Sequence, residues 1–139
     1  MARHALLIGL GLLCAAATLG CGDVLAEVSG TVTVDGEPLQ EGEIIFEEAD
    51  QNKSPEAGPI VGGKYTVRVL PGSKKVRINA SRPTKKPERV LGAAARESMV
   101  APEFNERTQL TAEVKPGKQD GVNFAVKGIP DRPHRRRVP

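Results

Sequence analysis

The sequence predicts an all-β fold, a β-sandwich of about seven short strands behind an N-terminal signal helix. Two stretches, 65–69 and 76–80, alternate apolar and polar residues with the period of half-buried strands. Turn residues recur between such stretches, and the chain holds 15 glycines and 11 prolines. Little of the chain beyond the N-terminal segment shows a helical period. These observations together favour short strands joined by tight turns.

Residues 1–20 have the composition of a targeting segment. Arg3 supplies the positive start, residues 5–19 are apolar, and small residues follow at Gly20 and Gly22. A membrane-spanning helix needs roughly 20 apolar residues, so this run is short for a permanent anchor. We therefore expect residues 1–20 to be removed as a signal peptide.

The end of that segment, Thr18-Leu19-Gly20-Cys21, resembles the lipobox of bacterial lipoproteins. The resemblance implies that Cys21 becomes the lipidated N-terminus, acylated with palmitate-type chains, and that residues 21–26 form a tether. An alternative stays open, because Val24-Leu25-Ala26 also fits a small-x-small cleavage site. Cleavage there would remove Cys21 and release a secreted domain.

The cysteine count favours the lipidated form. Only Cys14 and Cys21 occur in the chain, and Cys14 lies inside the apolar run that would be discarded. The mature chain then has no disulfide available. A single cysteine at the cleavage point is better explained as a lipid attachment site than as a free thiol in an oxidising compartment.

The domain is expected to span residues 27–127. Its first strand is predicted at 27–34, followed by a tight turn at Asp35-Gly36 and a second strand at 43–48 with Ile44 and Phe46 inward. A loop is predicted at 50–58 and a short strand at 59–61, with Gly62-Gly63 as the next turn.

Strands 65–69 and 76–80 are predicted to form the central pair. Leu70-Pro71-Gly72-Ser73 joins them with the chemistry of a type II turn, and the remaining strands are expected to add to this pair. The connection from 81 to 103 is long for a compact domain, and a short helical turn is predicted within 88–99.

Two strands, 108–114 and 121–126, are expected to close the domain. The first would turn Leu110, Ala112 and Val114 inward, and the second Val122, Phe124 and Val126. Residues 128–139 have three prolines, several arginines and no periodicity, and are predicted to be a disordered basic tail. One core is expected from Val32, Phe46, Tyr65, Val67, Ile78, Leu110 and Phe124.

The strand and turn residues also carry a family resemblance. Residues 30–39 (GTVTVDGEPL), 42–46 (GEIIF), 63–65 (GKY) and 70–72 (LPG) are similar to the carboxypeptidase regulatory-like domain. Pro102-Glu103-Phe104-Asn105 and the last strands resemble its small secreted or lipidated members in planctomycete bacteria. The resemblance covers residues 27–127 and implies a transthyretin-like or Ig-like sandwich that acts as a non-catalytic folding or interaction module.

Charge is segregated along the chain although the net charge is only +3. Residues 23–56 hold ten acids against Lys53, and residues 64–96 hold ten bases against Glu88. One interpretation is that strands of opposite sign pair and give mixed, solvated faces. The other is a contiguous basic face on the central pair and its loop, which would suit an anionic partner.

Metal binding and catalysis have weaker support. The carboxylates of Glu41, Glu43, Glu47, Glu48 and Asp50 suggest a calcium site by number, but their spacing lacks the D-x-D-x-D-G pattern. His4 leaves with the signal and His134 lies in the tail, so no histidine serves a catalytic triad or zinc site. Four aromatic residues are too few for the stacking faces that single-stranded nucleic acid requires.

The sequence therefore favours a cell-envelope lipoprotein, held at a membrane through Cys21, whose sandwich is a non-catalytic structural or binding module. No cofactor, metal or nucleic acid is expected, and the partner would be an envelope protein or polysaccharide. Gly22 after the cysteine favours the outer over the inner membrane. The alternatives are a secreted hydrolase with an unrecognised carboxylate site and a basic-surface binder of anionic polysaccharide.

Overall fold

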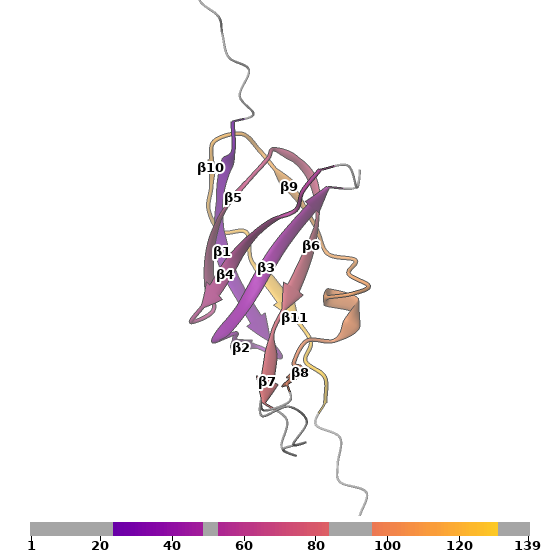
Figure 1. Ribbon diagram of the computed structural model, residues 1–139. Helices are drawn as coiled ribbons and strands as arrows, with labels where there is room; N and C mark the ends of the chain where they lie inside the picture. The colour runs from indigo at the N-terminus through magenta and orange to yellow at the C-terminus, as the bar shows by residue number, and fades with distance from the viewer. Residues whose placement is uncertain (1–23, 49–52, 84–95, 131–139) are drawn as a thin grey trace, which may run out of the picture.

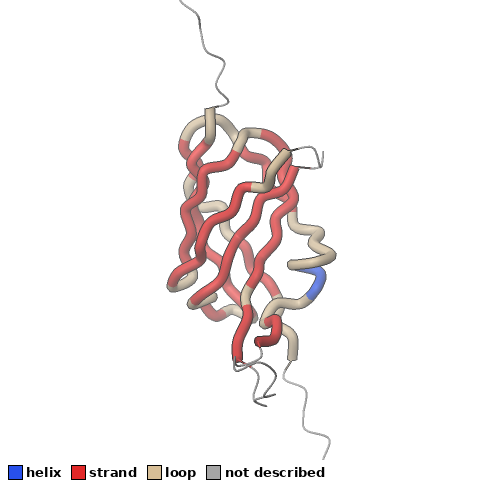
Figure 2. Tube along the Cα trace, viewed as in Figure 1, coloured by secondary structure: helices blue, strands red, loops and turns tan. Residues whose placement is uncertain are grey.

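The structure, a computed structural model, describes residues 24–48, 53–83 and 96–130. In these ranges the chain forms one curled, mainly antiparallel sheet that wraps around a core, plus a small two-stranded sheet (Figures 1 and 2). The prediction of an all-β sandwich is confirmed. The signal peptide, Cys21 and residues 131–139 of the basic tail lie outside the described residues.

The described residues contain eleven strands and one 3-10 turn. The strands are β1 (Ala26–Val34), β2 (Glu37–Pro38), β3 (Glu41–Glu48), β4 (Glu56–Val61), β5 (Lys64–Val69), β6 (Gly72–Asn79), β7 (Ser81–Pro83), β8 (Arg96–Ser98), β9 (Thr111–Val114), β10 (Lys118–Gln119) and β11 (Phe124–Val126). The turn, η1, spans Pro102–Phe104. No helix in the described part of the chain is long and apolar enough to cross a membrane.

The two predicted tight turns are present. Asp35 and Gly36 have φ of 51° and 88°, which joins β1 to β2 as a hairpin. Gly62 and Gly63 have φ of 57° and 77° between β4 and β5. A Cβ atom on Gly63 would also lie 2.7 Å from the Pro38 side chain, so this corner requires glycine for space as well as for conformation.

The predicted central pair is wrong. The strand order is β10-β1-β5-β4-β3-β6-β9, so β5 pairs with β1 and β4, whereas β6 pairs with β3 and β9. The short connection at Leu70-Pro71 therefore carries the chain between separate parts of the sheet. Alternation specifies which face of a strand is buried, but it does not specify the neighbouring strand.

The two closing strands also do not pair with each other. β9 pairs with β6, and β10 and β11 both run parallel to β1. Between β10 and β11 the chain follows the same edge of β1 with a one-residue shift in register. It passes Gly30 so closely that a Cβ atom there would lie 1.9 Å from the carbonyl oxygen of Val122. β9 and β11 are shorter than predicted, and Leu110, Ala112 and Val122 are only partly buried.

Three other boundaries differ from the predictions. β4 begins at Glu56 within the predicted 50–58 loop, where Glu56, Ala57 and Gly58 pair with Phe46, Ile45 and Ile44 of β3. β7 and β8 pair within the predicted long connection, so residues 96–98 are a strand where a helical turn was predicted. Residues 88–95 of that turn lie outside the described residues. Gly128 and Ile129 pair with the segment around Val100, so ordered pairing extends beyond residue 127.

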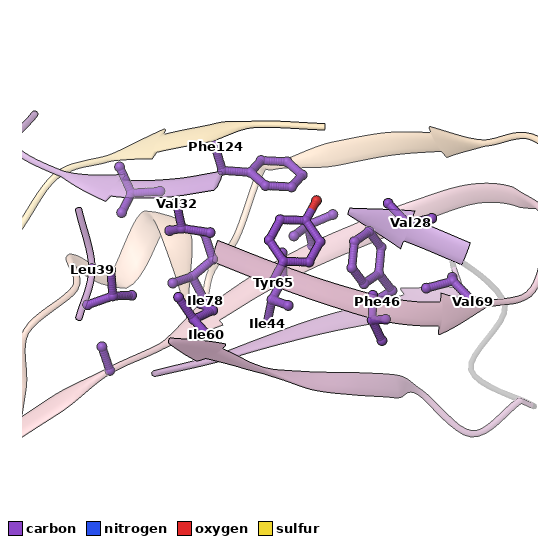
Figure 3. Close-up of a cluster of buried hydrophobic side chains, with 14 of the residues drawn as sticks. Val28, Val32, Leu39, Ile44, Phe46, Ile60, Tyr65, Val69, Ile78 and Phe124 are labelled. Carbon is purple, nitrogen blue, oxygen red and sulfur yellow. The ribbon is translucent and has the colours of Figure 1, made fainter. Parts of the chain in front are cut away.

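The core agrees with the predicted set. Val32, Phe46, Tyr65, Val67, Ile78 and Phe124 are buried in one cluster, and Leu110 packs against it from a partly buried position. Figure 3 shows the Tyr65 ring between those of Phe46 and Phe124, with centroid distances of 6.3 and 6.4 Å. The Tyr65 hydroxyl donates to the carbonyl oxygen of Val122 at 2.6 Å, and burial raises the pKa of this phenol.

Candidate functional site

A polar cleft of about 370 Å³ lies between β3, the end of β6 and the β7–β8 hairpin. The cleft is shallow and open to solvent, so a ligand bound in it would stay partly exposed. The lining residues are Glu41, Gly42 and Glu43 from β3, Asn79, Ala80 and Ser81, then Arg96, Glu97 and Ser98 from β8, and Asn105 after η1. Carboxylates, amides, hydroxyls and one guanidinium therefore face the same space.

The hairpin side of the cleft is fixed by hydrogen bonds. Arg96 donates from Nε to the Ser81 hydroxyl at 2.8 Å and from a terminal nitrogen to the Ser81 carbonyl at 2.7 Å. Arg82 and Glu97 oppose each other across the hairpin and form an ion pair of 2.7 Å. These contacts hold β7 against β8 without an apolar core of their own.

The opposite wall depends on a glycine. A Cβ atom at Gly42 would lie 2.7 Å from the carbonyl oxygen of Asn79 and 3.0 Å from the Leu39 side chain. β3 therefore approaches the end of β6 closely only because residue 42 lacks a side chain. Glu41 and Glu43 flank it on the exposed face of β3.

The cleft can bind polar ligands through these groups. The described residues include no histidine or cysteine, so within them no Ser-His or Cys-His pair can activate a nucleophile. No aromatic residue lines the cleft to act as a platform for a sugar ring. Its chemistry is that of hydrogen bonding and charge recognition.

A second polar cluster lies inside the sandwich at the other end of β3. Lys74 on β6 has a fully buried side chain, and its Nζ lies 2.8 Å from a carboxylate oxygen of Glu48 and 3.9 Å from one of Glu56. Glu48 and Lys74 are direct partners in the β3–β6 register. The hydrogen bond from Lys74 lowers the pKa of the Glu48 carboxyl from its ordinary value.

Glu56 completes this cluster from β4. One of its carboxylate oxygens accepts from the backbone NH of Leu70 at 3.4 Å, and the other is buried without a hydrogen-bond partner. Lys53 also approaches Glu48, at 3.3 Å from the solvent side. The cluster thus ties β3, β4 and β6 together, and the sequence analysis missed it because Lys74 was not assigned to a strand. The signal was present, since Lys74 precedes Val76 by two residues on the inward face.

The acids proposed for calcium do not form one site in the described residues. Glu47 points outward and pairs with Arg77 at 2.7 Å, whereas Glu48 points inward to Lys74. Glu41 and Glu43 lie at the cleft, and Asp50 lies outside the described residues. No group of three or more potential metal ligands occurs in the part of the chain that the structure describes.

The charge segregation is explained by strand pairing in the described residues. Acidic β3 lies beside basic β6, where Glu47 opposes Lys75 and contacts Arg77. Glu27 on β1 opposes Arg68 on β5 and contacts Lys118 at 3.4 Å. Because β5 and β6 are separated by β4 and β3, their bases do not make the contiguous basic face of the second interpretation.

No protein-family model and no curated protein matches the sequence. Among solved structures, the fold is similar to a DUF3823 family protein from Parabacteroides merdae at 16% identity and a TM-score of 0.42, covering 78% of this chain and 48% of that one. A 9R-lipoxygenase from Cyanothece aligns at 14% identity and a TM-score of 0.43, covering 79% of this chain and 18% of that one. The chain thus spans about half of the first protein and less than a fifth of the second. Neither likeness is close enough to carry an argument about family or activity.

Proposed function

We propose that this chain is a cell-envelope lipoprotein whose sandwich, of the carboxypeptidase regulatory-like and transthyretin-like type, is a non-catalytic structural or binding module. Cys21 carries the acyl chains, and the outer membrane is the favoured location. The tether ends at Leu25 and not at the predicted residue 26, because Ala26 is the first residue of β1. Envelope proteins or polysaccharides are the proposed partners. The polar cleft between β3 and β8 is the surface through which such a module would recognise polar groups.

The burial of Ala26 at the start of β1 is the observation that most supports this proposal over secretion. Ala26 is the first residue of β1, pairs with Val69 and has an exposed fraction of 0%. The rival cleavage after Val24-Leu25-Ala26 would remove this core residue and one rung of the β1–β5 ladder. Cleavage before Cys21 leaves the strand complete, which supports lipoprotein processing over cleavage after Ala26.

The proposal is tested by comparing the wild-type protein with Cys21→Ser in a bacterial host. Wild type is expected to partition into detergent and to incorporate labelled palmitate, and Cys21→Ser is expected to do neither. Cys14→Ser is the matched control, since it removes the other cysteine of the chain and should behave as wild type. A wild-type protein that stays in the aqueous phase without label would contradict the proposal.

A further inference from the structure

Exposed apolar side chains of the described residues gather where the tether joins the sandwich. Only three large apolar residues of this part of the chain are exposed, and two are the consecutive Val24 and Leu25, at 76% and 45% exposure. The third, Val61, precedes the turn between β4 and β5. Figure 1 places the start of β1, β10 and the β9–β10 loop at one end of the molecule, with the β4–β5 turn, β2, β7 and β8 toward the other.

Two basic residues, Arg68 and Lys118, line a cavity together with Leu25 at that end. This shallow cavity of about 440 Å³ is lined by Leu25, Glu27, Arg68, Gly117 and Lys118. Its one acid, Glu27, contacts Lys118 at 3.4 Å, whereas Arg68 forms no ion pair with any described residue. Lys115 is also exposed, in the neighbouring β9–β10 loop. The lining therefore keeps an excess of positive charge beside an apolar side chain.

The backbone holds this arrangement in place. The NH of Glu27 donates to the carbonyl oxygen of Gly117 at 2.9 Å, which fixes the β9–β10 loop against the start of β1. Gly117 has a φ of 94°, a conformation that turns the chain between Lys115 and Lys118. Arg68 lies on β5 directly opposite Glu27. The bases thus come from two strands that both pair with β1, namely β5 and β10, and from the loop that leads into β10.

We propose that this end of the sandwich is a membrane-contact surface that binds anionic phospholipid, with Val24 and Leu25 against the acyl boundary and Arg68, Lys115 and Lys118 at the phosphate level. The proposal rests on the proposed anchoring through Cys21. Three peptide units separate Cys21 from Val24, and an extended chain spans at most about 3.6 Å per residue, so Val24 lies within about 11 Å of the anchored residue. An apolar pair with flanking bases is the composition that interfacial segments use at anionic membranes.

The test separates this surface from the acylation itself. The chain 21–139 contains one cysteine, so the Cys21 thiol can be coupled chemically to a maleimide lipid in vesicles whether or not cells acylate it. The chain has no tryptophan, so a single introduced tryptophan reports its own position. Leu25→Trp is compared with Val61→Trp, a matched exposed apolar site toward the opposite end, in vesicles containing brominated phosphatidylglycerol.

Leu25→Trp is expected to be quenched by the brominated lipid, and Val61→Trp is expected to remain unquenched. Adding Arg68→Gln and Lys118→Gln to Leu25→Trp should lower the equilibrium constant for contact of this surface with the bilayer about fivefold for each base removed. Replacing phosphatidylglycerol by phosphatidylcholine, or raising the salt concentration, should also weaken this contact. The control pair Lys64→Gln and Lys127→Gln removes two exposed bases elsewhere and should leave quenching unchanged.

Three results would overturn the proposal. Equal quenching of the two tryptophans would show that the tethered domain has no preferred orientation. Absence of Leu25→Trp quenching after verified coupling would show that this end does not touch the bilayer. Quenching that is independent of lipid charge would show that Arg68 and Lys118 bind no headgroup. A failure of acylation in cells would leave all of these measurements intact, because the coupling is chemical.

Discussion

The charged Lys74 side chain is buried at one end of the sandwich, where Glu48 lies directly opposite it on β3. The Lys74 side chain is fully buried, while the two acids that face it keep exposed fractions of 17% and 18%. A buried ammonium without a partner is strongly unfavourable, so Lys74 is tolerated only in this register. The pair therefore makes the alignment of β3 with β6 energetically specific.

Replacing Lys74 by alanine should lower the free energy of unfolding by about 3 kcal/mol. This value lies near the lower end of the losses found when a buried ion pair is broken, because the acids that remain, Glu48 and Glu56, are partly exposed. The measurement is urea unfolding. Lys75→Ala is the control, since the neighbouring Lys75 is exposed and its loss should change stability by less than about 0.5 kcal/mol. Equal effects of the two substitutions would contradict the assigned burial of Lys74.

The same pair gives stability a dependence on pH. The pKa of Glu48 in the fold lies below its ordinary value of 4.5, mainly because Lys74 donates to it. As pH falls, the Glu48 carboxyl of the unfolded chain therefore binds a proton before that of the folded chain. The stabilisation that Glu48 gives to the fold is complete above the ordinary pKa and is lost as pH drops through the lower pKa of the folded state. Melting curves should show less acid destabilisation for Glu48→Gln than for wild type. Parallel curves would show that this carboxyl does not contribute.

At the scale of elements, β1 organises the sheet because four other strands pair with it. β5 and β2 are antiparallel to it, and β10 and β11 are parallel. Between the two parallel pairings the chain bulges against Gly30. There the NH of Val122 donates to the carbonyl oxygen of Ser29, and the carbonyl oxygen of Val122 accepts from the Tyr65 hydroxyl. After this bulge Phe124 packs into the core.

Gly30→Ala tests this close approach. The added Cβ would lie 1.9 Å from the carbonyl oxygen of Val122, a backbone atom that is itself hydrogen-bonded, so either β1 or the backbone around Val122 must move. Overpacking of this kind costs about 1 to 3 kcal/mol or more. We expect a corresponding loss in chemical unfolding, with Thr66→Ala on the exposed face of β5 as a near-neutral control. Unchanged stability for Gly30→Ala would show that Val122 does not lie against Gly30.

Local alternation was enough to predict which apolar residues of β1, β3, β5 and β6 are buried, because the face of a strand is set by a period of two. It could not predict that β5 and β6 do not pair. Leu70-Pro71 has the composition of a hairpin turn but connects two strands that are not neighbours in the sheet. It also could not predict the ion pair that allows Lys74 to be buried, or the cleft. Both depend on a register partner, Glu48 in one case and the β7–β8 pairing in the other, that lies far away in sequence.

At the scale of the whole molecule, one core joins strands from both ends of the chain. Phe124 on β11 packs beside Tyr65 on β5, and Tyr65 beside Phe46 on β3. No disulfide is available to the chain from Cys21 onward, so this core and the ladders around it must supply the stability.

Phe124→Ala should therefore destabilise the entire domain. Truncation of a buried phenylalanine costs about 3 to 5 kcal/mol, which corresponds to a fall of at least about 10 °C in the melting temperature of a domain of this size. The transition is expected to remain single when followed by circular dichroism and by Tyr65 fluorescence. A melting temperature equal to that of wild type would mean that β11 does not belong to the core.

The central claim is that the domain is held at a membrane through an acylated Cys21, and the mass of the N-terminal peptide tests it most directly. Protein is purified from the membrane fraction of a bacterial host that processes lipoproteins, and its N-terminal peptide is analysed by mass spectrometry. The account predicts a peptide that begins at Cys21 and carries the added mass of acyl chains. An unmodified peptide that begins at Glu27 would contradict it and would make the protein a soluble, secreted domain that lacks Ala26.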